Sequence, residues 1–138
     1  MNTDFLDAHE RHLTDAEALH SAGRLANADH LYGLSAECGL KKLMVEFGMR
    51  YDSQNDRPQD VADQRHIDRI WYRYETYRQG RPAGSRYPLS TPAPFDNWNV
   101  SQRYSRQDQF DLARVNPHRA GAREVHGLIQ QAQLEGLV

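Results

Sequence analysis

The chain contains a single cysteine, few lysines and no long apolar run, and each shortage excludes a class of protein. Cys38 has no partner for an internal disulfide. It falls in a segment with the pattern of a buried helix, so we interpret it as a small apolar core residue. No stretch approaches the ~18 apolar residues of a membrane span, and residues 1–12 carry charges where a secretory signal would be apolar. We therefore expect a cytoplasmic protein without membrane association.

Motifs for several kinds of chemistry are also missing. The sequence has no glycine-rich phosphate loop, no cysteine array of the zinc type, no HExxH pattern and no internal repeat. Histidines are spread over both ends of the chain, and without further converging ligands we interpret them as surface residues: His9, His12, His20, His118 and His126. We expect neither a metal nor another cofactor.

Lysine is scarce where arginine is abundant. Lys41 and Lys42 are the only lysines among 17 basic residues. Residues 1–60 hold 11 acidic against 6 basic side chains, whereas residues 61–138 hold 8 against 11. The planar guanidinium suits phosphate binding and base stacking, so the bias indicates nucleic acid as a partner. An arginine-rich proteome would produce the same bias.

Length and periodicity predict the fold class. At 138 residues the chain is about one domain long, so we expect a single domain over residues 1–138. Apolar residues recur at helical spacing, which predicts an all-α compact bundle of four to five helices. A first helix is expected over residues 3–22, which the capping-box pattern from Thr14 to Glu17 would divide if it marked a second start.

The pattern is strongest from Arg24 to Phe47, where no proline occurs and Gly48 follows as a stop. Small residues on neighbouring faces of this segment would let other helices approach closely, and they predict the central helix of the core: Ala28, Ser35, Ala36 and Gly39.

The rest of the chain alternates between loops and helices. Residues 48–60 read as a polar loop, and residues 61–79 as a third helix with the buried stripe Ile67, Ile70, Trp71, Tyr74 and Tyr77. A long proline-rich loop over residues 80–97 precedes a short Trp/Arg-Tyr element over residues 98–104 and a helical turn near residues 107–114. The C-terminal helix is expected to begin with Asn116 as cap and Pro117 at its first position. Its inward face would carry Val125, Leu128, Ile129 and Ala132.

One segment resembles a known family. Residues 27–44, NADHLYGLSAECGLKKLM, are similar to the second helix of HEPN domains, in which a face of small residues precedes a glutamate and a lysine four apart, here Glu37 and Lys41. Later landmarks follow in the same order, with His66 opening the third helix and then Trp98 and Arg103. HEPN domains are helical nucleotide- and RNA-binding domains common in bacterial toxin–antitoxin and defence systems.

The resemblance also implies catalytic residues. Active HEPN proteins are metal-independent ribonucleases whose motif joins an arginine to a histidine a few residues later, and this chain carries Arg24-LANAD-His30 with Tyr32 two residues on. His30 would act as base, Arg24 would hold the phosphate, and Arg103 would be a second anion contact. Six residues of helix turn about 600° and rise about 9 Å. A shared site therefore requires Arg24 to lie in the first bend of the helix, or two copies of the chain to meet.

Two alternatives stay open for this site. The family motif normally lies in a later helix, near Arg103, but residues 108–111 are Asp, Gln, Phe and Asp. The missing histidine indicates either a site displaced to Arg24 and His30 or a non-catalytic member. Glu37 and Lys41 also have the spacing of an ordinary ion pair on an exposed helix, an interpretation that burial of Glu37 would weaken.

A second candidate site lies on the third helix. Arginines alternate there with aromatic residues and could grip phosphates and stack bases, namely Arg65, Arg69, Arg73 and Arg78. A solvated helix face would have the same pattern, because Asp63, Asp68 and Glu75 dilute the charge.

These observations predict an RNA-binding or metal-independent RNA-cleaving module of a bacterial defence or toxin–antitoxin system. We expect a homodimer that acts on RNA, with transfer RNA among the candidates, or on a nucleotide, together with a partner protein encoded nearby. The alternative is a non-catalytic helical module that binds a partner protein or a nucleotide, as an accessory or antitoxin subunit. A small helical scaffold or inhibitor without a nucleic-acid role is the third hypothesis.

Overall fold

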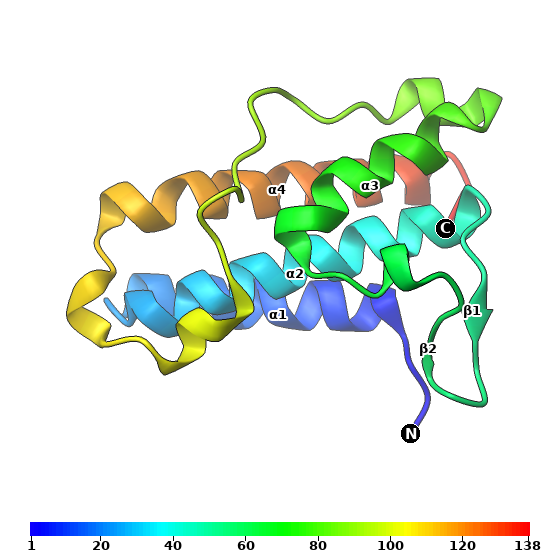
Figure 1. The fold of residues 1–138 in the computed structure, drawn as a ribbon. Helices are drawn as coiled ribbons and strands as arrows, with labels where there is room; N and C mark the ends of the chain where they lie inside the picture. Colours follow the sequence, from blue (N-terminus) through cyan, green and yellow to red (C-terminus); the bar gives the residue numbers. More distant parts are fainter.

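Four α-helices make up most of the structure, a computed structural model that describes residues 1–138 (Figure 1). They are α1 (Phe5–Ser21), α2 (Leu25–Glu46), α3 (Ile67–Gln79) and α4 (Leu112–Leu134). Strands β1 (Tyr51–Asp52) and β2 (Arg57–Pro58) form a small antiparallel hairpin. The 3₁₀ turns are η1 (Val61–Asp63), η2 (Pro82–Arg86), η3 (Val100–Tyr104) and η4 (Gln107–Gln109). The predicted all-α bundle is confirmed, and none of its helices has the length and apolar composition needed to cross a membrane.

Helix α2 is the centre of the bundle, as its sequence predicted. It forms an antiparallel hairpin with α1 through a turn in which Gly23 has a φ of +74°, and α3 and α4 both pack on it (Figure 1). Small residues permit this close packing. A Cβ atom added to Gly39 would lie 2.5 Å from a Val125 methyl group of α4 and 2.8 Å from His9 Nδ1 of α1.

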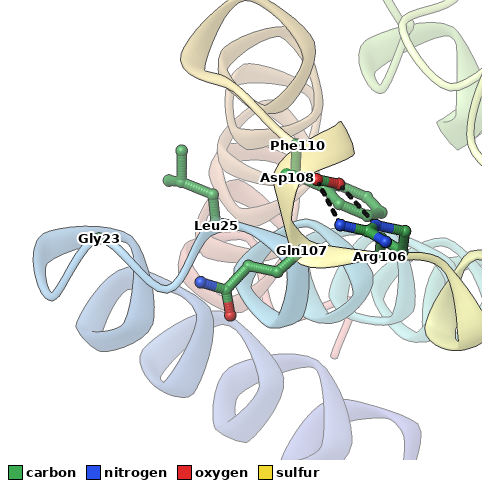
Figure 2. A pocket seen from close by; sticks show the side chains of 6 residues that line it. All are labelled: Gly23, Leu25, Arg106, Gln107, Asp108 and Phe110. Carbon is green, nitrogen blue, oxygen red and sulfur yellow. Dashed lines mark hydrogen bonds and ion pairs between the residues drawn. The ribbon is translucent and has the colours of Figure 1, made fainter.

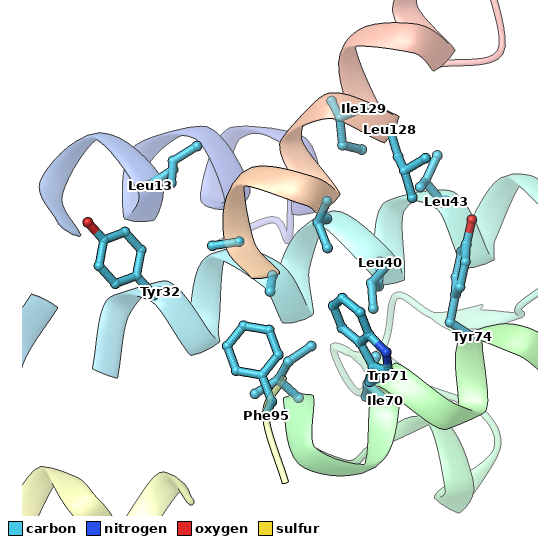
Figure 3. Close-up of a cluster of buried hydrophobic side chains, with 14 of the residues drawn as sticks. Leu13, Tyr32, Leu40, Leu43, Ile70, Trp71, Tyr74, Phe95, Leu128 and Ile129 are labelled. Carbon is cyan, nitrogen blue, oxygen red and sulfur yellow. The ribbon is translucent and has the colours of Figure 1, made fainter. Parts of the chain in front are cut away.

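The hydrophobic core forms where α2, α3 and α4 meet (Figure 3). Leu40 and Leu43 of α2 lie between Trp71 of α3 and the Leu128–Ile129 pair of α4. The predicted stripe of α3 is confirmed, because Ile67, Ile70, Trp71 and Tyr74 are buried and Tyr77 is half-buried. The predicted inward face of α4 is confirmed as well.

Two helix starts differ from the prediction. Helix α3 begins at Ile67 rather than at residue 61, with His66 as its N-cap, and residues 61–63 form the separate turn η1, whose N-cap Asp60 accepts the Ala62 N–H. Helix α4 begins at Leu112, where the Asp111 side chain accepts the Arg114 N–H at 2.9 Å. Pro117 therefore lies inside α4 and not at its first position. The Asp111 cap sets the start of α4.

Helix α1, by contrast, is continuous, and Thr14 does not begin a second helix. Its N-cap is Asp4, whose side chain accepts the Asp7 N–H at 3.0 Å. Two of the histidines expected at the surface are fully buried instead. His9 lies between α1 and α2 with its Nδ1 atom 2.8 Å from the Ser35 carbonyl oxygen, and its ring stacks on His126. His118 of α4 is the other.

The proline-rich segment is anchored rather than loose. It leaves α3, passes across α2 and rounds the end of the bundle at the α1–α2 turn before entering α4 (Figure 1). Buried aromatic side chains hold it at intervals, namely Tyr87, Phe95, Trp98 and Phe110. The Trp98 indole lies directly on α2 at Gly33, where an added Cβ atom would be 2.1 Å from the ring.

We expect the substitution Gly33→Ala to lower the free energy of unfolding by about 1–3 kcal/mol, because the new methyl group overlaps the Trp98 indole. Urea denaturation measures this directly. The matched control is Gly127→Ala in α4, where an added Cβ atom meets nothing within 4 Å, and this change should stabilise the protein by about 0.5–1 kcal/mol. Equal effects of the two substitutions would contradict the placement of Trp98.

Candidate functional site

A row of polar side chains follows one face of α2. His30, Glu37 and Lys41 share this face because seven and eleven residues correspond to about two and three helical turns. Only 11% of the Glu37 side chain and 8% of the Lys41 side chain are exposed. The predicted ion pair is present, but its burial weakens the interpretation as an ordinary pair on an exposed helix. Burying two charged groups is costly unless each is well paired, so their remaining partners matter.

Glu37 is the hub of these contacts. One carboxylate oxygen accepts a hydrogen bond from Lys41 Nζ at 3.1 Å, and the other lies 3.0 Å from Nδ1 of His66. The Lys41 ammonium group also donates to the backbone carbonyl oxygen of Arg65 at 3.0 Å. The charged pair on α2 thus fixes the residues at the start of α3, and it leaves the His66 ring about half-exposed.

Two imidazole rings pack against Trp98. The His30 ring stacks on it with centroids 5.8 Å apart, and the His66 ring is tilted against it at 6.5 Å. The indole is buried, and its Nε1 atom donates to the Asp29 carbonyl oxygen at 3.0 Å. Arg103 of η3 lies close enough to His30 for its charge to act on that ring. We call His30, Glu37, Lys41, His66 and Arg103 the two-histidine site.

The pKa values of the two histidines are shifted in opposite directions. Burial lowers the pKa of His30, and the positive charge of Arg103 lowers it further. Its Nδ1 atom is buried without a hydrogen-bond partner, which disfavours an imidazolium with two N–H groups to satisfy. The hydrogen bond to Glu37 raises the pKa of His66 against the effects of burial and of Lys41. Near neutral pH the site therefore pairs a neutral imidazole with one that is readily protonated.

A buried network holds this arrangement from behind. The Asp29 carboxylate is fully buried and accepts hydrogen bonds from His118 Nδ1 of α4 and from Gln102 Nε2 of η3, both at 2.5 Å. His118 Nε2 lies 2.7 Å from Asn97 Oδ1, so the network also reaches the residue before Trp98. Because Asp29 directly precedes His30, the network sets where Trp98 meets the His30 ring.

Two of the predicted catalytic residues, Arg24 and Tyr32, lie apart from this site. Arg24 does lie in the bend before α2, but its side chain is exposed and makes no hydrogen bond. The hollow next to it has a volume of about 490 Å³ and contains no histidine, and the Arg106 guanidinium that lines it is paired with Asp108 (Figure 2). Tyr32 is fully buried beside His20, and burial raises its pKa to about 12. Of the predicted catalytic residues, His30 and Arg103 lie within electrostatic range of each other, whereas Arg24 and Tyr32 lie elsewhere.

The four arginines predicted to bind nucleic acid fall into two groups. Arg65 and Arg69 are exposed and have no side-chain hydrogen bonds. Arg73 is engaged with Asp63 at 2.7 Å and with Asp60 at 3.2 Å, and Arg78 is paired with Glu75. Only the first two have free guanidinium groups.

Sequence reasoning did not identify His66, Glu37 and Lys41 as one site. The spacing of His30, Glu37 and Lys41 along α2 was a usable signal, because it places three polar groups on one helical face. His66 carried no such signal, since its approach to Glu37 depends on the path of residues 48–66.

No protein-family model, curated protein or solved structure matches this chain. The structure contains no cluster of three or more histidine, cysteine, aspartate or glutamate side chains arranged to hold a metal ion.

Proton titration of the two histidines by NMR tests the site directly. The pKa of His66 should lie above its ordinary value of 6.5 and that of His30 below it. Glu37→Gln should lower the pKa of His66, because the negative partner is removed. The His66–Glu37 pair should stabilise the fold fully below pH 6.5, and this contribution should be lost as the pH rises through the raised pKa. An unchanged His66 titration in Glu37→Gln would refute the pairing.

The buried network should contribute strongly to stability. Asp29→Ala leaves His118 and Gln102 without their acceptor, and we expect a loss of about 3–5 kcal/mol in unfolding free energy. Asp108→Ala, which removes an exposed ion pair with Arg106, should change it by less than about 1 kcal/mol. In a double-mutant cycle, Asp29→Ala and His118→Ala together should cost less than the sum of the single changes. Additive losses would mean that the two residues do not interact.

Proposed function

We propose that the two-histidine site binds RNA and cleaves it by transesterification without a metal ion. The observation that carries this proposal is that His30 and His66 both pack against the Trp98 ring, with the charge of Arg103 acting on His30. General acid–base cleavage of RNA needs one group to remove a proton and another to supply one. A pair of imidazoles, one with a lowered and one with a raised pKa, meets that need near neutral pH.

The reaction would proceed in one displacement. His30 takes the proton of a ribose 2′-hydroxyl group, and the 2′ oxygen attacks the adjacent phosphorus atom. The bond from phosphorus to the 5′ oxygen breaks as His66 gives its proton to that oxygen. The products are a 2′,3′-cyclic phosphate and a free 5′-hydroxyl group, and no water is consumed. Arg103 would hold the phosphate and stabilise its developing negative charge.

Glu37 and Lys41 act as positioning residues in this proposal. Glu37 orients the His66 ring through Nδ1, so that the Nε2 atom is left to deliver the proton. Lys41 neutralises Glu37 and fixes the backbone at Arg65, which keeps the start of α3 against α2. Neither group needs to touch the substrate.

The proposal agrees with the HEPN resemblance in its chemistry and departs from it in the residues. The resemblance suggests metal-independent RNA cleavage in a toxin–antitoxin or defence system, with Arg24 and Tyr32 beside His30 and Arg103 as a second anion contact. In this proposal His66 replaces Arg24 and Tyr32, and Arg103 keeps its role as the anion contact. A homodimer in which Arg24 of a second copy reaches the site would combine both arrangements.

Purified protein should cleave single-stranded RNA in buffer containing EDTA and leave 2′,3′-cyclic phosphate ends. His30→Ala and His66→Ala should each lower the rate by about 10²-fold or more. The pH profile should rise with deprotonation of His30 and fall with deprotonation of His66, and Glu37→Gln should move the falling limb to lower pH. His20→Ala is the matched control, because His20 contacts Asn116 outside the site. It should retain full activity.

A protein that cuts no RNA, or whose cleavage survives both histidine substitutions, would rule out this chemistry. The second candidate, a non-catalytic protein-interaction module, would then be favoured by the exposed apolar side chains near the site. Tyr104 is 79% exposed beside Arg103, and Leu112 is 52% exposed at the start of α4. A complex with a partner protein that is lost in Tyr104→Ala would support that function.

A further inference from the structure

The exposed face of α3 contains a groove next to the two-histidine site. The groove has a volume of about 780 Å³ and lies between this face and η1. Its α3 side is formed by Arg69, Tyr72, Arg73 and Thr76, Arg65 lines it just before the helix begins, and Val61 lines the η1 side. The opposite side of α3 faces the core (Figure 3).

Two of the three arginines that line this groove are not paired with acids. The side chains of Arg65 and Arg69 line it without hydrogen-bond partners, whereas the Arg73 side chain is paired with Asp63 and Asp60. Two free guanidinium groups that line one groove attract anions, and their planar shape suits phosphate oxygens.

An aromatic surface lies beside these cations. Tyr72 is 55% exposed, and its hydroxyl group donates to Asp96 at 2.7 Å. This hydrogen bond fixes the ring while leaving it accessible. Exposed aromatic rings next to free arginines suit the stacking of unpaired bases, which a duplex does not offer.

The groove connects with the two-histidine site through Arg65. The side chain of this residue lines the groove, its carbonyl oxygen accepts the Lys41 hydrogen bond, and His66 follows it in the chain. A strand bound at Arg65 would therefore lie one residue along the chain from His66.

We propose that this groove binds single-stranded RNA, with phosphates on Arg65 and Arg69 and a base stacked on Tyr72, and directs the strand to His66. The inference rests on the proposed function in one respect, that the adjoining site acts on RNA. Duplex RNA should bind weakly, because its bases are already stacked and paired.

Binding is best measured by fluorescence anisotropy with a labelled 2′-O-methyl oligonucleotide, which lacks the attacking hydroxyl group and cannot be cleaved. Arg65→Ala/Arg69→Ala should weaken binding about tenfold or more and flatten its dependence on salt concentration. The control Arg86→Ala/Arg123→Ala removes the same charge elsewhere, at side chains paired with Glu135 and Glu17, and should bind like the wild type. Tyr72→Ala should weaken binding about tenfold, and Tyr72→Phe should not.

Equal losses in the two double-arginine variants would overturn the inference, since net charge alone would explain binding. Equal affinity for single-stranded and duplex oligonucleotides would overturn it as well. The proposed cleavage is tested separately. If unmodified RNA stays intact while binding depends on the groove, the cleavage proposal fails and the binding site stands. If cleavage occurs and the groove variants bind normally, the proposed binding groove fails and the cleavage proposal stands.

Discussion

The structure depends on one buried carboxylate. The Asp29 side chain is fully buried, and the free-energy cost of removing its charge from water is offset by hydrogen bonds from His118 of α4 and Gln102 of η3. The backbone carbonyl oxygen of Asp29 accepts the Trp98 indole N–H. One residue of α2 thus joins the C-terminal helix to the segment that rounds the end of the bundle. Because buried polar networks stabilise only when every member is satisfied, the positions of these elements are coupled.

This coupling explains how a short chain builds a defined surface from irregular segments. Residues 80–111 contain only 3₁₀ turns, yet Trp98 is seated on Gly33 and held by Asp29. The ring is then a rigid wall against which His30 stacks. From the other direction, Glu37 and Lys41 hold the start of α3, so that His66 meets the same ring.

Much of the fold was predictable from the sequence. The apolar spacing and small residues of α2 identified the central helix, and the stripe of α3 identified its buried side. The helix boundaries were less predictable. Asn116 and Pro117 are a good helix start by local preference, but Asp111 is an equally good cap, and the buried position of Val115 adds a turn to α4. His9 and His118 were expected at the surface because their partners, Ser35 and Asp29, lie on another helix.

Local sequence patterns by themselves determined the helical class, the core-facing sides of the helices and the central role of α2. The reason is that a buried helix face requires apolar residues at helical spacing along the sequence. Tertiary structure alone decided which polar groups meet. His30, His66 and Arg103 come from three separate elements, and their approach depends on the path of two loops around the bundle. Hydrogen bonds between distant residues produce no periodic pattern in the sequence. This site forms only because Trp98 packs on Gly33 in the folded chain.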